Sequence, residues 1–145
     1  MPQRFNRWHQ LSADECLRLL TQHHLGRIAV IDDDGPMILP VTYVVDGESV
    51  LFRTDQAGTL QAAAYGADQV ALEVDVIDEC NRTGWSVLVR GTAEQVPESA
   101  EVDRLRRLPL YPWVPGAETS YARIEPTLVS GRRVSVPSLP STWLG

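Results

Sequence analysis

Apolar residues recur at every second position along several stretches of the chain, and this period predicts strands. Between residues 70 and 77, Val or Leu alternates with Ala, Glu, Asp and Ile, so a strand here has one drier face. Shorter β-branched and apolar runs elsewhere end in turn sequences. The predicted strands span residues 28–31, 37–45, 49–54, 70–77 and 85–93, with one or two more within 121–136.

Two turn sequences separate the first three of these strands. Asp32-Asp33-Asp34-Gly35 is a strong turn, and Asp46-Gly47 returns the chain as a hairpin. The aspartates lack the spacing and terminal glutamate of an EF-hand, so we interpret them as a solvated turn. Five to seven strands linked mostly by hairpins predict a mainly β fold, an antiparallel barrel with a few peripheral helices.

A helix is predicted to open before the first strand. Ser12 can cap its first turn with Glu15 reciprocating, while Leu11 and Cys16 fit a hydrophobic staple. The residues predicted to share its packed face are Leu17, Leu20 and His24. Further predicted segments are a short helix at 58–65, a helix at 97–107 and a proline-rich loop at 108–116.

Length and charge limit the classes of protein. With 145 residues, 43% of them hydrophobic, the chain suits one domain spanning residues 1–145. A net charge of -6 argues against a non-specific nucleic-acid binder, and no apolar run approaches the ~20 residues of a membrane span. Cys16 and Cys80 are isolated thiols without disulfide or Cys-x-x-Cys spacing. We therefore expect a cytoplasmic protein.

Several kinds of active site find no support in the sequence. The chain contains no lysine, which excludes enzymes that form a Schiff base through a lysine amine, including those that attach pyridoxal phosphate. It also lacks a Gly-x-Ser-x-Gly elbow, a His-Glu-x-x-His pair and a Walker loop. His23 and His24 are adjacent, so on a helix they point about 100° apart and are poorly placed to share a metal.

Three segments together suggest a phosphorylated cofactor. Arg53 and Thr54 end a predicted strand and precede a predicted helix start, a geometry that offers several donors to a phosphate. The strand backbone near residues 40–43 can address the polar edge of a planar ring. Trp85 can pack beside such a ring, at the start of a later strand. Each segment alone also fits an ordinary structural role, so the hypothesis depends on their joint occurrence.

The chain resembles the pyridoxamine 5'-phosphate oxidase-like flavoproteins of the FMN-binding split-barrel superfamily, and specifically their small single-domain actinobacterial-type members. The resemblance covers nearly the whole chain, and its specificity lies in the order and spacing of short motifs. These motifs are residues 25–29 (LGRIA), 38–47 (ILPVTYVVDG), 51–54 (LFRT), 74–75 (VD), 84–91 (GWSVLVRG), 112–116 (PWVPG), 123–126 (RIEP) and 130–133 (SGRR).

The resemblance implies a homodimer with two FMN sites in clefts between the subunits. In such proteins one strand segment lines the flavin ring, a following arginine and threonine hold the phosphate, and a later strand contributes to the cleft. The matching positions here are Pro40, Val41, Thr42 and Tyr43 for the ring, Arg53 and Thr54 for the phosphate, and Trp85 and Ser86 for the cleft, with Trp113 near it.

One departure from the family pattern concerns the phosphate. The family commonly shows a Gly-Thr-Lys-Leu run whose lysine contacts phosphate; alignment on Leu60 places Ala57, Gly58 and Thr59 in the positions of its Gly, Thr and Lys. Thr59 can donate a hydrogen bond but carries no charge, and Gly58 can still offer a backbone N–H. Losing the ion pair is worth about ten- to hundred-fold in affinity. A long polyanionic deazaflavin coenzyme should suffer more than FMN, which favours FMN.

Two classes of function remain open from sequence. The first is an FMN-dependent oxidoreductase that acts on a small planar substrate stacked on the exposed ring, with Tyr43 and Arg123 as candidate acid or base groups. The second is a non-enzymatic flavin-, deazaflavin- or haem-binding protein, or a split-barrel dimer whose cofactor site has degenerated. Oxidation of pyridoxamine phosphate itself is disfavoured, because the full-length oxidases carry a longer substrate-binding C-terminus.

Overall fold

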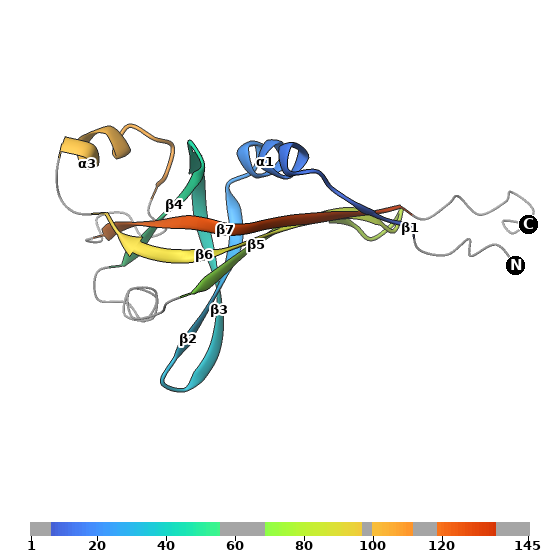
Figure 1. Ribbon diagram of the computed structural model, residues 1–145, viewed down its shortest axis with the longest axis horizontal. Coiled ribbons are helices and arrows are strands. Elements are labelled where there is room, and N and C mark those ends of the chain that lie inside the picture. The colour runs from blue at the N-terminus through green and yellow to red at the C-terminus, as the bar shows by residue number, and fades with distance from the viewer. Residues whose placement is uncertain (1–6, 56–68, 97–99, 112–118, 136–145) are drawn as a thin grey trace, which may run out of the picture.

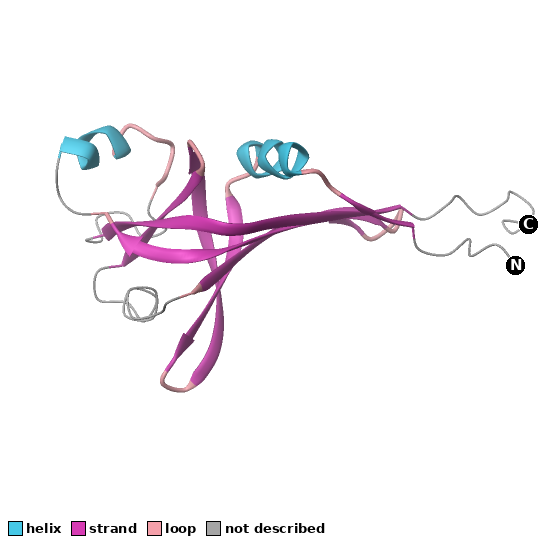
Figure 2. Ribbon diagram, viewed as in Figure 1, coloured by secondary structure: helices cyan, strands magenta, loops and turns pink. Residues whose placement is uncertain are grey.

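The computed structural model describes residues 7–55, 69–96, 100–111 and 119–135, and most of these described residues lie in antiparallel strands (Figure 1). Helices lie outside the strands, as Figure 2 shows. In chain order the elements are β1 (Arg7–Gln10), α1 (Ala13–Gln22), β2 (Leu25–Asp32), β3 (Gly35–Asp46), β4 (Ser49–Asp55), β5 (Val70–Asp78), β6 (Thr83–Gln95), α3 (Ala100–Leu105) and β7 (Thr119–Ser135).

Six of the strands close into a barrel. The strand order is β1-β7-β4-β3-β2-β5-β6, and an additional antiparallel pairing of β6 with β7 joins the two ends of the ring. β1 lies outside the ring and pairs with the last four residues of β7, from Arg7↔Ser135 to Gln10↔Arg132. This arrangement confirms the predicted antiparallel barrel with peripheral helices. β1 was not predicted.

The 17-residue strand β7 ties the barrel together. Its first six residues pair with β4, its last four with β1, and most of its length with β6. The β6–β7 register shifts between Arg90 and Gly91. A Cβ at Gly91 would overlap the Glu125 carbonyl, so the close approach of the two strands at this bulge requires glycine.

Two hydrophobic clusters stabilise the fold, one inside the barrel and one between the barrel and the α3 segment. The larger one fills the interior and includes Ile28, Tyr43, Phe52, Leu72, Val74, Val87 and Ile124. The smaller one lies outside the wall, between β3, β4, β7 and the α3 segment, and contains Val44, Leu51, Val96, Leu105, Leu110 and Tyr121. Neighbouring residues of β3 and β4 therefore serve different clusters, as the two-residue period of a strand requires.

Helix α1 begins as predicted and ends earlier than predicted. The Ser12 hydroxyl accepts a hydrogen bond from the Glu15 backbone N–H at 3.2 Å, so Ser12 is the N-cap. The helix stops at Gln22 because His23 is extended (φ -125°, ψ 162°), and His24 is therefore not on it. The predicted packed face was wrong in part. The buried residues are Cys16, Leu19 and Leu20, whereas Leu17 is 44% exposed.

The buried face of α1 packs on the barrel strands β3, β6 and β7. Gly131 of β7 lies directly beneath it, where a Cβ would be 2.7 Å from Cys16 Sγ and 3.0 Å from a Leu11 methyl. The close fit explains why Leu11 and Cys16, the two residues of the predicted staple, are both buried. In Figure 1, α1 covers one side of the barrel and α3 one end, while the β2–β3 hairpin projects away from both.

Other sequence predictions fall partly outside the described residues. The predicted helix at 58–65 lies wholly outside them, and so does most of the proline-rich loop. The predicted helix at 97–107 contains α3. Within the described ranges, no helix combines the length and the apolar character that crossing a bilayer would need.

Candidate functional site

The segment predicted to line a ring is divided by strand alternation between the two faces of β3. Val41 and Tyr43 point into the barrel and are buried, whereas Pro40 is exposed and Thr42 half-buried on the outer face. Only the outer residues and the strand backbone are therefore available to a ligand outside the barrel.

Tyr43 connects the barrel interior to α1. Its hydroxyl donates a 2.7 Å hydrogen bond to the Leu20 carbonyl, and its backbone N–H donates to the His24 carbonyl at 2.8 Å. Burial raises the pKa of the Tyr43 hydroxyl well above its usual range. A neutral hydroxyl that is buried and already bonded to a main-chain carbonyl is a structural group, so the geometry gives no support to Tyr43 as an acid or base.

Arg53 lies on the outer face of β4, beside its ladder partner Tyr121 on β7. Its Nη1 atom donates to the Leu110 carbonyl at 3.1 Å, and Cζ lies 4.9 Å from the centroid of the Tyr121 ring. Its Nε atom is shielded from solvent and has no hydrogen-bond partner in the part of the chain that the structure describes. Thr54 follows on the same strand, and its side chain is outside what the structure describes.

The unpartnered Nε of Arg53 indicates a missing acceptor. Leaving a buried donor unsatisfied costs about 1–3 kcal/mol, and more when the donor is charged. The Tyr121 ring and the Leu110 carbonyl hold the guanidinium in place without neutralising its charge. An anionic oxygen at Nε would supply both the acceptor and the countercharge.

Arg123, the second candidate acid or base from sequence, belongs to an ion cluster. Its Nη2 atom is 3.4 Å from Asp46 Oδ2, and its Nε is 3.9 Å from Glu125 Oε1. Arg104 contacts the same Asp46 oxygen at 2.8 Å. The hydrogen bond from Arg104 is the main cause of a lowered Asp46 pKa. These contacts give Arg123 a role in joining β7, β3 and α3.

The predicted pair Trp85 and Ser86 is also divided by alternation. Trp85 is half-buried and packs against the interior cluster, with its ring centroid 4.9 Å from that of His23 at an angle of 63°. Ser86 points outward from β6. Trp85 thus supports the end of α1, and only Ser86 of this pair reaches the outer surface.

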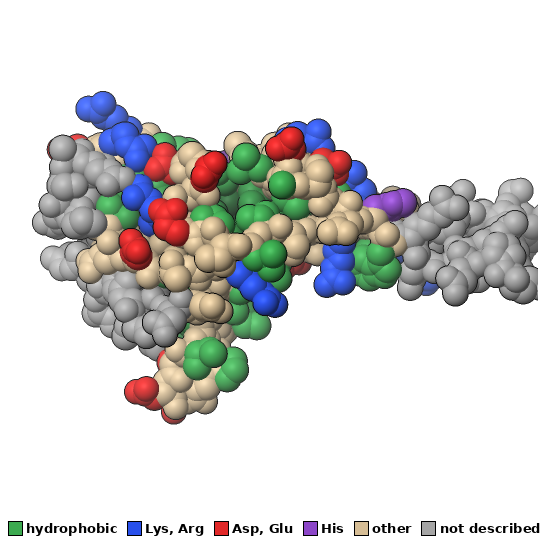
Figure 3. All heavy atoms as spheres, in the orientation of Figure 1, with side chains coloured by type: hydrophobic (Ala, Val, Ile, Leu, Met, Phe, Trp, Pro, Cys, Tyr) green, Lys and Arg blue, Asp and Glu red, His purple; other side chains and the backbone are tan. Residues whose placement is uncertain are grey.

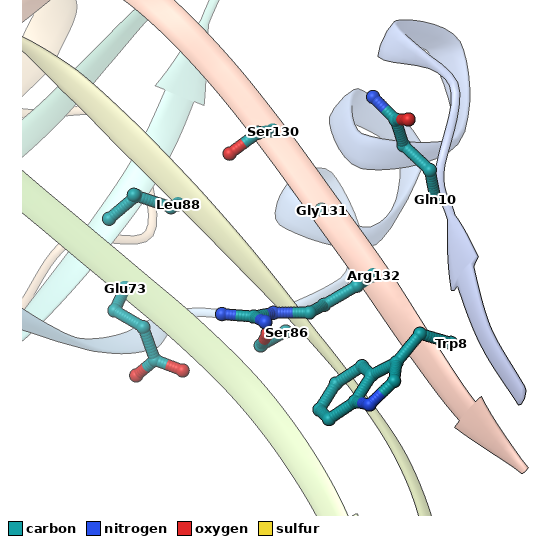
Figure 4. A pocket seen from close by; sticks show the side chains of 8 residues that line it. All are labelled: Trp8, Gln10, Glu73, Ser86, Leu88, Ser130, Gly131 and Arg132. Carbon is teal, nitrogen blue, oxygen red and sulfur yellow. The ribbon is translucent and has the colours of Figure 1, made fainter. Parts of the chain in front are cut away.

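Ser86 lines a cavity of about 460 Å³ on the outer face, which we call the Arg132 cavity (Figure 4). In Figure 4, Arg132 extends from β7 across Ser86 toward β5, the strand that carries Glu73. Its Cζ atom lies 4.8 Å from the centroid of the Trp8 ring. The residues that line the cavity are Trp8, Gln10, Glu73, Ser86, Leu88, Ser130, Gly131 and Arg132.

Of these residues, sequence reasoning selected only Ser86. Trp8 was missed because β1 is a four-residue strand that pairs with residues more than 120 positions away. The signal for Glu73 was present, since it lies on the more polar face of the predicted strand 70–77. Arg132 lies within the family motif at residues 130–133 (SGRR). Its proximity to Ser86 follows from the β6–β7 register, in which Ser86 pairs with Arg132.

Glu73, an ionisable residue of β5, lines the Arg132 cavity. Arg27 of β2 places Nη1 3.4 Å from Glu73 Oε2 and 3.5 Å from Asp75 Oδ2. Burial is the main cause that raises the pKa of the Glu73 carboxyl, the neighbouring Asp75 adds to it and Arg27 opposes it, and together they place this pKa at about 7. The side of the cavity opposite Arg132 therefore carries a carboxyl group that is mostly neutral at pH 6 and about half ionised at pH 7.

Arg53 and Ser86 are well separated on one barrel. From β4 to β6 the wall passes through β3, β2 and β5, which is four strand spacings, or about 19 Å. The other route passes through β7, where their ladder partners Tyr121 and Arg132 are eleven residues apart. The outer face of the strands between them carries exposed apolar side chains such as Leu25 (55%) and Ile38 (67%).

A second cavity, of about 330 Å³, lies between α1 and the β3–β4 hairpin. Its floor is apolar, and Asp14, Glu48 and Glu125 stand at its edge. Figure 3 shows hydrophobic side chains in a hollow with acidic side chains beside it. Three carboxylates would repel a phosphate, so this cavity does not suit a phosphorylated cofactor.

Four residues predicted for the site, Gly58, Thr59, Leu60 and Trp113, lie outside the described residues. Their predicted roles stay predictions. Within the described ranges, no group of three or more His, Cys, Asp or Glu side chains could hold a metal ion.

Comparison with known proteins gives a consistent set of relatives. A family model described as pyridoxamine 5'-phosphate oxidase matches residues 12–133. An uncharacterised protein of Mycobacterium tuberculosis is 36% identical over 133 residues, which cover 89% of this chain and 87% of that protein. The solved structure of a FAD-binding protein from Mycobacterium smegmatis is 39% identical, with a TM-score of 0.77, and the match covers 88% of this chain and 98% of that chain. A FAD-binding protein of Mesorhizobium loti shares the fold, with a TM-score of 0.75 at 24% identity over 90% of this chain and 98% of that chain.

Proposed function

Since the chain belongs to the pyridoxamine 5'-phosphate oxidase family, we propose that it binds a flavin, with Arg53 on the flavin phosphate. The observation that carries the proposal is the buried, unpartnered Nε of Arg53. A phosphate oxygen is an anionic acceptor of the kind that this atom lacks. Thr54, next on the strand, and the backbone N–H groups at residues 58–59 are the further donors that the sequence predicts.

The flavin ring is proposed to lie in a cleft between two copies of the chain. One barrel presents Pro40, Thr42 and Ser86 on its outer face, and a flat ligand on the outer face of one barrel has one side open to water. The exposed Leu25 and Ile38 on the same wall provide apolar area for a second copy to cover. In such a homodimer, Arg53 of one copy and the Arg132 cavity of the other can address the same ligand.

FMN is the flavin we propose, and FAD is the second candidate. FMN carries the ring and the phosphate that these contacts address. FAD carries both as well, and the Mycobacterium smegmatis relative is a FAD-binding protein. A phosphate monoester bears about -1.5 to -2 charges at pH 7, whereas each phosphate of a dinucleotide bears one. Because Thr59 stands in place of the usual lysine, the lower charge of each FAD phosphate is the reason that FAD is kept as the second candidate.

A bound flavin would supply hydride or electron transfer, and the protein's part is to orient the ring and to tune it through hydrogen bonds. We therefore propose a cytoplasmic oxidoreductase that acts on a small planar substrate stacked on the open face of the ring. The oxidoreductase activity depends on a substrate, while flavin binding can be tested alone.

The proposal is tested by titrating the purified protein with riboflavin, FMN and FAD while following flavin fluorescence. We expect FMN or FAD to bind at least ten-fold more tightly than riboflavin, because riboflavin has no phosphate for Arg53. The ratio of the FMN and FAD affinities decides between the two cofactors. Light scattering on the same samples should give the mass of a dimer. No binding by any of the three, or a monomer that binds flavin normally, contradicts the proposal.

A further inference from the structure

The outer face of β5 holds two carboxyl groups that share one cationic nitrogen. Glu73 and Asp75 are two residues apart on a strand, so both side chains point outward. Nη1 of Arg27 is the atom that approaches both of them, at 3.4 and 3.5 Å. One guanidinium cannot balance two carboxylates, so one negative charge of the pair is left over unless one carboxyl keeps its proton.

The surroundings of Glu73 differ from element to element. From β2 it faces Arg27, and from its own strand Asp75. From β6 its ladder partner is the apolar Leu88, with the exposed Arg90 diagonal to it. From β7, Arg132 extends toward it across the cavity (Figure 4). Apolar packing on one side and Asp75 on the other favour the neutral carboxyl, which agrees with a pKa of about 7.

A neutral carboxyl changes what the Arg132 cavity offers to a ligand. Ionised, Glu73 only accepts hydrogen bonds; protonated, it also donates one. Arg132, Ser86 and Ser130 are donors from the other lining strands. Among the residues that the structure describes, Arg132 has no carboxylate partner and keeps its charge for a ligand. A protonated Glu73 therefore completes a ring of donors.

We propose that Glu73 is the proton-exchanging group of the Arg132 cavity, where its neutral carboxyl donates a hydrogen bond to an acceptor atom at the edge of a planar ligand. Binding of that ligand then takes up a proton from solvent whenever Glu73 is ionised beforehand. The ligand class is a flat ring with a carbonyl or unprotonated ring nitrogen at its edge. The inference rests on the proposed function, since the flavin ring or its substrate is the planar ligand.

The first test uses the ligand-free protein and measures the Glu73 carboxyl by carbon-13 NMR between pH 4 and pH 9. We expect it to titrate near neutral pH, well above an ordinary glutamate. Asp75→Asn should move the titration to lower pH, because it removes the neighbouring negative charge. Arg27→Gln should move it to higher pH, because it removes the cation. Titration in the ordinary glutamate range, unmoved by either substitution, overturns the inference.

The second test measures FMN affinity of wild type and Glu73→Gln at pH 6, 7 and 8. The amide of Glu73→Gln donates a hydrogen bond at every pH, so the FMN affinity of this variant should not change through titration at position 73. The quotient of the wild-type affinity and the Glu73→Gln affinity is taken at each pH. The titration of the FMN phosphate affects both proteins equally and cancels in this quotient. With a requirement for one proton, the quotient should fall about ten-fold from pH 6 to pH 8. Glu79→Gln, in the exposed β5–β6 turn, is the matched control and should behave as wild type.

The outcomes separate this inference from the proposed function. FMN binding with a constant quotient overturns the role of Glu73 and leaves flavin binding intact. Loss of all FMN binding in every variant overturns the proposed function and the ligand contact of Glu73 together. Both are supported if the quotient depends on pH and if Arg132→Gln weakens FMN binding. Arg133→Gln, on the opposite face of β7, should then leave FMN affinity unchanged.

Discussion

The guanidinium carbon of Arg53 lies 4.9 Å from the centre of the Tyr121 ring, and the two residues are ladder partners on β4 and β7. The aromatic face stabilises the cation without using its hydrogen-bond donors. Within the described part of the chain, the guanidinium bonds to the main chain through one donor, on Nη1, which donates to the Leu110 carbonyl. The contact with the Tyr121 ring therefore orients Arg53 and leaves its Nε donor available to an anion.

Replacing Arg53 by Gln should weaken FMN binding about ten- to hundred-fold, because a charge-assisted hydrogen bond contributes about 1.5–3 kcal/mol. Riboflavin, which has no phosphate, should bind both proteins with similar affinity. Fluorescence titration measures both ligands. Arg106→Gln is the control, since Arg106 is an exposed arginine near the α3 segment that contacts Asp103 at 3.5 Å. Equal FMN affinity of wild type and Arg53→Gln would show that Arg53 does not hold the phosphate.

Thr59→Lys should tighten FMN binding by a similar factor, because it restores the cation that the family pattern places at this position. The gain should be larger for FMN than for FAD, whose phosphates each carry a single charge, and absent for riboflavin. The same titrations measure it. An equal gain for riboflavin would mean that the lysine acts elsewhere than on a phosphate.

Tyr43→Phe should lower the free energy of unfolding by about 0.5–1.5 kcal/mol, because it removes the hydrogen bond from the buried hydroxyl to the Leu20 carbonyl. The loss should lie at the lower end, since the same carbonyl also accepts from the His23 N–H at 3.3 Å. Urea unfolding measures it. Flavin affinity should be unchanged, and a large change would return Tyr43 to the list of ligand-contacting groups.

Glu73→Gln should stabilise the fold at pH 8 by about 1–2 kcal/mol, with allowance for solvent screening of a side chain that is one-third exposed. The folded-state pKa of about 7 exceeds the ordinary value of 4.5, so the unfolded chain releases this proton first. The wild type loses stability relative to the variant as pH rises from 4.5 to 7, and the difference is constant above that. Urea unfolding at pH 4.5 and pH 8 tests it; a difference that is equal at both pH values contradicts the assignment.

The sequence predicted the fold well because its strands carry local signals. Every predicted strand occurs, and the turns at Asp32–Gly35 and Asp46–Gly47 connect β2 to β3 and β3 to β4. The family resemblance is confirmed by the match over residues 12–133. β1 was missed because four residues hold too short a pattern, and their partner strand supplies the reason for their conformation.

The candidate site was harder to predict because alternation and register decide which side chains meet. Val41, Tyr43 and Trp85 are adjacent in sequence to outward residues, yet they face the interior. Trp8, Glu73 and Arg132 come from three strands that only the sheet order brings to one cavity. The sequence therefore predicted most of the strands, while the question of which of their side chains share a face or a cavity needed the pairing of the whole barrel.

The central claim, that this protein binds a flavin, is tested most directly by the visible absorption spectrum of the protein as purified, followed by a thermal melt with added FMN or FAD. We predict flavin absorption bands, or, for protein purified without its ligand, a rise in melting temperature, because a ligand at 100 times its Kd stabilises the folded state by about 2.7 kcal/mol. A colourless protein whose melting temperature is unchanged by saturating FMN and by saturating FAD would contradict the claim.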